Sequence, residues 1–174
     1  MVLPKSLFQA AAVRTWARWM VWRRAVIIDT ETTTLHGRIC ELAVADARGT
    51  VLLDTLVDPG CPIDPAATAV HGIHDADVAG APTVLEVLPQ LRALVGRRPI
   101  LAYNAPYDRA VLTAEADRTG FQLGRLGRRH AWGCLMRARA LQEGRAWCRL
   151  DGGHRAAGDA RAASRVLRSL ANLL

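Results

Sequence analysis

A short apolar run that continues into two carboxylates constrains the fold of this chain more than any other stretch. The run is AVIIDTETTT, in which branched aliphatic residues lead directly into Asp29, and Glu31 follows two positions later. Aliphatic residues of this kind predict a buried strand. Because side chains alternate along a strand, the two carboxylates point to the same side of the sheet. Two like charges that close raise each other's pKa, so the pair predicts a cation between them.

The remaining elements predict one α/β domain with a mixed sheet. Residues 38–46 and 50–58 read as strands joined by a hairpin turn at Ala47, Arg48 and Gly49. Further along, the patterns indicate two helices, a strand and a helix with proline in its first turn and glycine at its end: residues 65–70, 82–95, 99–103 and 106–120. A hairpin followed by strands that alternate with helices is typical of a single α/β domain.

The last third of the chain is less regular until its final helix. WGCLM, residues 132–136, is a candidate strand, and RARALQEG, residues 137–144, a candidate helix. The segment from residue 154 onward has helical spacing. Its apolar stripe consists of Ala160, Ala163, Val166, Leu167 and Leu170. This stripe predicts a helix that packs on the sheet.

Residues 4–24 predict an amphipathic helix rich in tryptophan and arginine. Four aromatic residues fall within about 120° on a helical wheel, with Arg14 and Arg18 outside that arc: Phe8, Trp16, Trp19 and Trp22. Such a helix can lie on a membrane surface or stack on bases. We favour a third role, in which residues 1–24 dock on a domain formed by residues 25–174.

Composition limits the classes of partner and the compartment. No apolar run reaches the roughly 18 to 20 residues that cross a bilayer, and no signal peptide opens the chain, so we expect a cytoplasmic protein without a membrane partner. The net charge of +7 suits a polyanion. Lys5 is the only lysine, however, and a coding genome rich in G and C gives the same arginine excess. The four cysteines form no CxxC pair, so a zinc cage is not expected.

Four acids occupy positions that structure alone does not require. Asp29 and Glu31 end the first strand, Asp108 lies in the first turn of a helix just beyond a strand, and Asp159 follows His154 by five residues. Taken singly, Asp108 is explained by helix capping and Asp159 by solvation. Groups at the carboxyl ends of α/β strands meet in one crevice, however. We therefore expect the four acids to converge.

Converging carboxylates predict a divalent metal centre. Mg²⁺ and Mn²⁺ prefer hard oxygen ligands, and two such ions about 3.5–4 Å apart can stabilise both oxygens of a phosphoryl displacement. No Walker loop accompanies the acids, so nucleotide binding of that kind is not supported. Gly152 and Gly153 place His154 on a flexible loop, from which its imidazole can accept a proton from attacking water.

Three motifs that contain these residues resemble a known family. DTETTT, YNAPYD and HRAAGDA are similar, in order, to the three exonuclease motifs of the DEDDh 3′→5′ exonucleases, the DnaQ-like group of the ribonuclease H-like superfamily. VHGIHDADVAGAPT also resembles the connection that follows the family's third strand. The resemblance extends over residues 26–170 and implies a ribonuclease H-like mixed five-stranded sheet flanked by helices.

The resemblance also implies roles for the polar residues of the motifs. Asp29, Glu31 and Asp159 would hold a first Mg²⁺ or Mn²⁺ ion. Asp29 would bridge to a second ion, to which Asp108 contributes, giving two ions per site. His154 would be the general base. The family thus implies five catalytic residues, of which four are metal ligands.

Substrate contacts are implied at four further positions. Thr32 and the backbone around Leu35 would receive the terminal nucleotide, and Asn104 would position the scissile end. His71 matches a family histidine, although it is equally well explained as a structural turn residue. Thr34 stands where the family usually has glycine and adds bulk beside the nucleotide pocket.

The implied activity is a metal-dependent 3′→5′ exonuclease that releases nucleoside monophosphates from DNA 3′ ends, in proofreading or repair. The single-stranded DNA 3′ end is then the substrate, and a DNA polymerase is a candidate partner. One alternative is a 3′→5′ exoribonuclease that acts on short RNA. The other is a catalytically silent module that binds nucleic acid or a polymerase, but such a module does not need all five polar positions.

Overall fold

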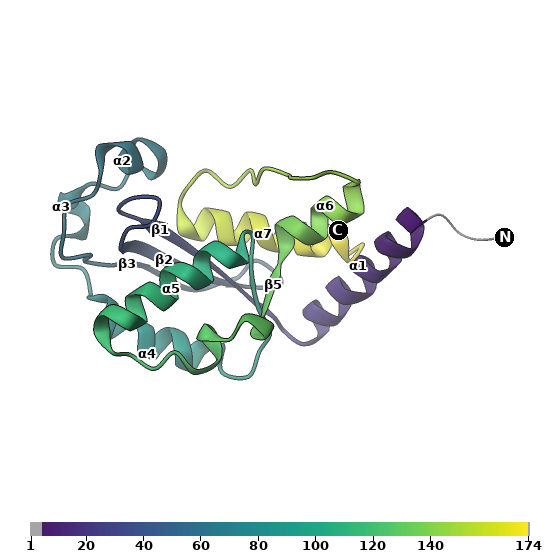
Figure 1. The fold of residues 1–174 in the computed structure, drawn as a ribbon, viewed down its shortest axis with the longest axis horizontal. Helices are drawn as coiled ribbons and strands as arrows, with labels where there is room; N and C mark the ends of the chain where they lie inside the picture. The colour runs from purple at the N-terminus through teal and green to yellow at the C-terminus, as the bar shows by residue number, and fades with distance from the viewer. Residues whose placement is uncertain (1–4, 174) are drawn as a thin grey trace.

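The computed structural model describes residues 5–173, and a five-stranded mixed sheet forms its centre (Figure 1). The strands lie in the order β3-β2-β1-β4-β5. Their bounds are Val26–Thr32 for β1, Ile39–Asp46 for β2, Val51–Leu56 for β3, Ile100–Ala102 for β4 and Trp132–Cys134 for β5. β1, β2 and β3 are antiparallel neighbours, whereas β4 and β5 run parallel to β1. The predicted mixed sheet is therefore confirmed.

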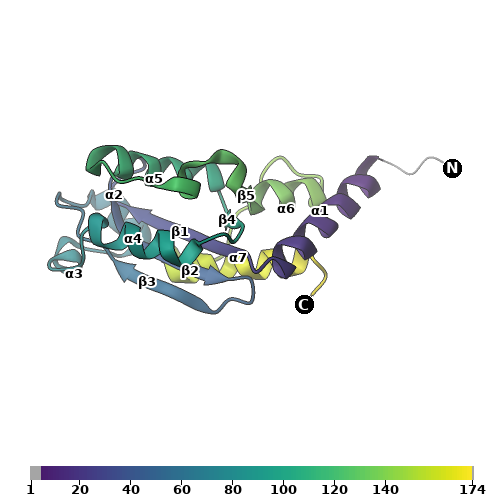
Figure 2. The same ribbon diagram turned by 90° about the horizontal axis from the view of Figure 1, so that it is seen from below.

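Helices cover both faces of this sheet. Seven α-helices and two short 3₁₀ helices are present in the described part of the chain: α1 Lys5–Trp22, α2 Pro65–His71, α3 Asp75–Val78, α4 Val84–Val95, α5 Ala105–Thr119, α6 Leu135–Glu143, α7 Ala156–Leu170, η1 Gly124–Gly127 and η2 Arg129–Ala131. Residues of α4 and α5 share a core cluster with one sheet face, and those of α1, α6 and α7 share another with the opposite face. Figure 2 shows α5 and α7 on opposite sides of β1.

Alternation along β1 decides which way the acids point. Val26 and Ile28 belong to the core cluster beneath α4 and α5, whereas Ile27 packs in the cluster beneath α7. Because Asp29 and Glu31 are in phase with Ile27, their side chains emerge on the face that α7 covers. The sequence pattern of β1 thus directs both carboxylates toward the last helix.

Most element boundaries follow from local signals. α4 begins at a capping box in which the Thr83 backbone N–H donates to the Glu86 carboxylate at 2.7 Å. α5 ends at Gly120, whose φ of +71° suits glycine. Two expectations were wrong at their edges. β1 continues one residue past Glu31 to Thr32, and α6 begins at Leu135, so Leu135 and Met136 of the candidate strand WGCLM are helical.

α1 packs on the domain through a different face from the predicted one. It contacts α6 and α7, and its buried side chains are Val13, Ala17 and Met20. Trp19 and Trp22 are 46% and 74% exposed, so the expectation that the whole aromatic stripe docks was wrong. Smaller aliphatic side chains let the helix axes approach more closely than two indoles would. The amino-terminal half of α1 extends beyond the rest of the molecule in both views (Figures 1 and 2).

One tryptophan of that stripe does contact the sheet. A Cβ atom added at Gly133 in β5 would lie 2.8 Å from Cζ2 of Trp16, so the indole packs directly on this glycine. The side chain of Phe8 and residues 1–4, the last of which begins the predicted helix, lie outside the described part of the chain. Within that part, every helix is too short or too polar to cross a lipid bilayer.

Candidate metal centre

The free edge of β1 brings α5 to the acids. β1 pairs with β4 only at Val26 and Ile27, so the rest of its edge on that side has no strand partner. The chain leaves β4 and enters α5 there, and Thr30 Oγ1 of β1 donates to Asp108 Oδ1 at 3.2 Å. Asp108 is only 4% exposed. The short β4 therefore places this carboxylate beside the carboxyl-terminal half of β1.

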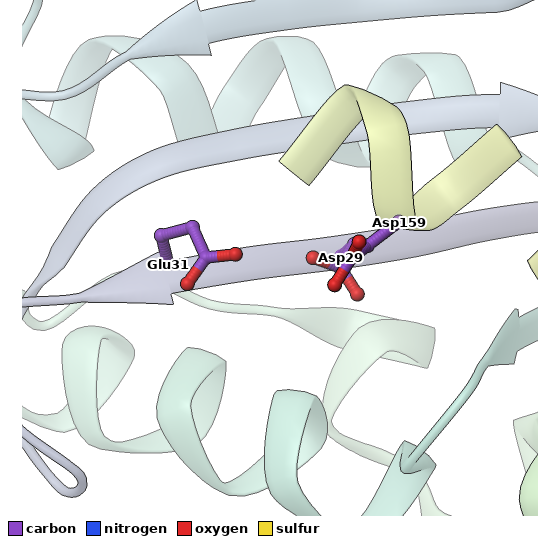
Figure 3. Close-up of side chains that lie close together, drawn as sticks. All are labelled: Asp29, Glu31 and Asp159. Atoms are coloured by element: carbon purple, nitrogen blue, oxygen red, sulfur yellow. The ribbon is translucent and has the colours of Figure 1, made fainter. Parts of the chain in front are cut away.

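Three carboxylates meet between β1 and α7. One oxygen from each of Asp29, Glu31 and Asp159 can be chosen so that all three lie within 4.8 Å of one another. Figure 3 shows Asp29 and Glu31 rising from β1 toward Asp159, which descends from the first turn of α7. All three side chains are half-buried. The predicted convergence of these acids is thus present in the structure, and Asp108 adjoins them from α5.

Burial and mutual repulsion both disfavour the charged forms of these acids. Burial, followed by the charges of Asp108, Glu31 and Asp159, raises the pKa of Asp29 well above its usual value. The same two causes, with Asp159 as the strongest neighbour, raise the pKa of Glu31 to about 8. Burial raises the pKa of Asp108 to about 7, although the hydrogen bond from Thr30 opposes this shift. Burial also raises the pKa of Asp159.

A fifth acid, Glu41, adjoins the cluster and was missed by the sequence analysis. Glu41 lies opposite Glu31 in the β1–β2 register and is 3% exposed. Its carboxylate accepts from Arg155 Nε at 3.0 Å and from the Ala156 backbone N–H at 2.8 Å. The Arg155 guanidinium compensates the charge of the Glu41 carboxylate, and both bonds connect the first turn of α7 to β2. A carboxylate inside the apolar run ICELAVAD was the available signal.

His154 lies on the loop that enters α7, as expected. Its backbone φ is +56°, and its N–H donates to Asp159 Oδ1 at 3.2 Å. The imidazole Nε2 lies 3.4 Å from Nη2 of Arg149. Gly152 packs so tightly against α7 that an added Cβ would lie 2.8 Å from the Asp159 Cα. The loop thus holds the histidine backbone at the cluster, with the ring beside an arginine.

Three of the four predicted substrate contacts, Thr32, Leu35 and His71, line a cavity of about 350 Å³ that Glu31 also borders. Thr32 is buried, and its Oγ1 donates to the Thr34 carbonyl at 2.7 Å. Leu35 is 73% exposed at the rim of this cavity. Tyr107, which the sequence analysis did not single out, also lines it, with its hydroxyl 2.8 Å from Thr32 Oγ1.

His71 and Asn104 differ in their relation to this cavity. His71 lines the same cavity but is buried; its Nδ1 accepts from the Ile73 N–H at 3.0 Å, and its Nε2 lies 3.3 Å from the Thr32 carbonyl. Burial lowers the pKa of this imidazole. These bonds correspond to the structural turn role that the sequence left open. Asn104 is exposed at the N-cap of α5 and is not among the residues that line this cavity.

The donor set fits a divalent cation. It offers carboxylate oxygens alone, which Mg²⁺, Mn²⁺ and Ca²⁺ prefer over softer ligands. A cation would also offset the repulsion that raises the pKa values of Asp29 and Glu31. The cluster therefore has both the chemistry and the excess negative charge of a metal centre.

Comparison with known proteins places this site in a family. A model of the exonuclease family RNase_T matches residues 26–167. An uncharacterised exonuclease, CP81 of Escherichia phage 186, is 34% identical over 119 residues, which cover 67% of this chain and 61% of the relative. Exodeoxyribonuclease 10 of Escherichia coli K12 is 42% identical over 89 residues, 49% of this chain and 39% of the relative. The chain thus spans less than two thirds of either curated relative.

A solved structure extends the likeness to most of the fold. Exonuclease X in complex with 5′ overhanging duplex DNA is 31% identical, with a TM-score of 0.66, over 85% of this chain and 91% of that one. The predicted ribonuclease H-like α/β fold is confirmed by this match. The exonuclease family depends on divalent metals, which agrees with the carboxylate cluster. The chain belongs to the exonuclease family, in its DnaQ-like group.

Proposed function

We propose that the chain is a metal-dependent 3′→5′ exonuclease that removes nucleoside monophosphates from DNA 3′ ends. The observation that carries this proposal is the gathering of carboxylates from β1 and α7, with Asp108 of α5 beside them. Relatives whose names specify DNA or exonuclease activity support the same substrate and reaction. A role in proofreading with a DNA polymerase is a prediction from the family resemblance.

Four acids would hold two Mg²⁺ or Mn²⁺ ions. Asp29, Glu31 and Asp159 would bind the first, and Asp29 with Asp108 the second. When bound, such ions supply positive charge to the scissile phosphate and make water more acidic. The all-carboxylate donor set and the raised pKa values of its members support this assignment.

The remaining residues would orient the DNA strand and accept the proton of the attacking water. The cavity formed by Thr32, Leu35 and Tyr107 would hold the terminal nucleotide, with the exposed leucine against its base. Asn104 would position the strand from the N-cap of α5. His154 would accept the proton that the attacking water loses as the new P–O bond forms and the bond to the 3′ oxygen breaks. Its backbone bond to Asp159 keeps it at the cluster.

The test uses 5′-labelled single-stranded DNA and RNA of the same sequence with Mg²⁺ or Mn²⁺. The protein should shorten the DNA stepwise from its 3′ end, more rapidly than the RNA. Asp108→Asn should abolish the shortening, whereas Asp117→Asn, an exposed residue near the other end of α5, should not. Intact DNA after incubation with both metals would refute the proposal and favour a silent binding module. Faster RNA shortening would move the substrate class to RNA.

A further inference from the structure

A second cavity, at the amino-terminal end of α5, is lined by arginines. Its volume is about 270 Å³, and three guanidinium side chains from separate elements border it: Arg109 of α5, Arg129 of η2 and Arg137 of α6. Trp132 of β5 also lines it. Arg129 and Arg137 are exposed, and Arg109 is half-buried. Neither the family motifs nor the proposed chemistry uses any of these four residues.

The fold places this arginine cavity at the same end of the sheet as the acids, where the parallel strands have their carboxyl ends. β4 and β5 run parallel to β1, so the carboxyl ends of all three strands lie at the same end of the sheet. Ala105 and Pro106 line the cavity, and Asp108 follows them within the first turns of α5. Adjacent strands are about 4.8 Å apart, so the step from β1 to β5 is on the order of 10 Å. A nucleic-acid strand with its end at the acids can therefore reach the cavity.

Charge in this cavity is not neutralised within the protein. In residues 5–173, four arginines form ion pairs with carboxylates, namely Arg118, Arg139, Arg145 and Arg155, and none of the three cavity arginines is among them. Arg137 is moreover the third residue of α6, where the helix macrodipole disfavours a positive charge. An anion in the cavity would be stabilised by the guanidinium groups and by the amino-terminal end of α6 together.

We propose that the arginine cavity binds backbone phosphates of the substrate strand upstream of the bond that is cleaved, an inference that rests on the proposed function. Guanidinium groups stay charged at all physiological pH values and form paired hydrogen bonds to phosphate oxygens. Phosphate contacts fix the register of a strand without reading its sequence. The Trp132 side chain offers an apolar surface to a sugar or base beside the phosphate.

The first test measures binding without cleavage. Fluorescence anisotropy of a labelled 12-nucleotide single strand, in EDTA and over a series of salt concentrations, gives the dissociation constant for each variant. Arg129→Ala with Arg137→Ala should weaken binding roughly tenfold and lower the slope of log affinity against log salt by about 1.4, since each phosphate contact to a single strand contributes about 0.7. The matched control is Arg48→Ala with Arg97→Ala, which removes two exposed arginines from turns at the opposite end of the sheet, between β2 and β3 and before β4.

A second assay separates this proposal from the proposed function. The p-nitrophenyl ester of thymidine 5′-monophosphate has no upstream phosphate, so the cavity variant, Arg129→Ala with Arg137→Ala, should hydrolyse it at the wild-type rate. The KM of the same variant for the 12-nucleotide strand should rise roughly tenfold. Equal losses of DNA binding in both double variants, or no loss in the cavity variant, would overturn the proposal. A selective loss of DNA binding in a protein that hydrolyses neither substrate would support the phosphate site and refute only the nuclease assignment.

Discussion

At the scale of single residues, the acids lie in surroundings that favour their neutral forms. Burial and neighbouring carboxylates raise the pKa of Glu31 to about 8, and burial raises that of Asp108 to about 7. Proteins normally avoid such clusters because each carboxylate loses solvation and repels the others. A divalent ion would restore the balance and displace protons from the cluster. We therefore expect a bound divalent cation to stabilise the ionised form of this cluster.

His154 is expected to act on turnover rather than on metal affinity. Replacing it by alanine removes the proposed proton acceptor but none of the carboxylate oxygens, so single-turnover DNA cleavage should fall roughly 10²- to 10⁴-fold while Mn²⁺ affinity stays near its wild-type value. Calorimetric Mn²⁺ titration beside rapid-quench kinetics measures both quantities. A parallel decline of rate and affinity would show that the imidazole is a ligand instead.

Glu41 is expected to hold α7 against the sheet. Glu41→Gln removes the buried charge that Arg155 and the Ala156 N–H contact, so the free energy of unfolding should fall by about 1–3 kcal/mol. Urea denaturation measures this change. Glu143→Gln, which disrupts a more exposed pair with Arg139, should cost less than about 1 kcal/mol. Equal losses in the two variants would mean that burial of the Glu41 pair adds nothing.

The sequence made some site residues visible and hid others. Asp29 and Glu31 stood out because two carboxylates follow directly on an apolar run. Glu41 carries the same signal more weakly, since a single acid in a strand is usually a solvent-facing residue. Tyr107 could not be identified because an aromatic residue in a first helical turn is ordinarily part of the core. Only the tertiary structure shows that its hydroxyl meets Thr32.

At the scale of elements, the loop before α7 depends on two glycines. The loop and helix backbones are in direct contact, because a Cβ on Gly158 would lie 2.6 Å from the Gly152 carbonyl oxygen. A Cβ on Gly152 would lie 2.8 Å from the Asp159 Cα. No other residue type allows this approach. The contact fixes His154 and Asp159 relative to each other.

Gly152→Ala should therefore separate the loop from α7. Displacement of His154 and Asp159 by about 1 Å is enough to lower single-turnover DNA cleavage by on the order of 10²-fold. Gly153→Ala is the comparison, since no atom lies within 4 Å of its added Cβ, although its φ of +90° strains a side chain. That variant should lose about 1 kcal/mol of stability with a smaller loss of rate. A larger loss of rate in Gly153→Ala would contradict this account of the loop.

The ends of helices were predictable where capping residues determine them. They were not predictable where tertiary packing determines them. The capping box at Thr83 and the glycine after α5 fixed helix ends that the sequence analysis had placed within two residues. The docking face of α1 was not predictable, because aromatic and aliphatic stripes both offer apolar area. The contacts with α6 and α7 selected the face with Ala17. The end of β5 at Cys134 likewise reflects packing, since Leu135, the first residue of α6, is buried in the core cluster that α1 and α7 share.

At the scale of the whole molecule, stability without metal should depend on pH. Folding raises the pKa values of the clustered acids, so the native state holds protons that unfolding releases, and stability falls as pH rises from about 5 to about 8. In EDTA the melting temperature should therefore decrease across this range. Glu31→Gln removes one of the raised groups and should make the decrease shallower; calorimetric scans at several pH values measure both slopes. Identical slopes would contradict the assigned cause.

The central claim is that the acids of β1, α5 and α7 form one divalent-metal centre. Isothermal titration of Mn²⁺ into the metal-free protein at pH 7.5 tests it most directly. The wild type should bind Mn²⁺ with release of protons, Asp29→Asn should lose this binding, and Asp117→Asn should keep it. A wild type that binds no Mn²⁺, or an Asp29→Asn variant that binds it equally well, would contradict the claim.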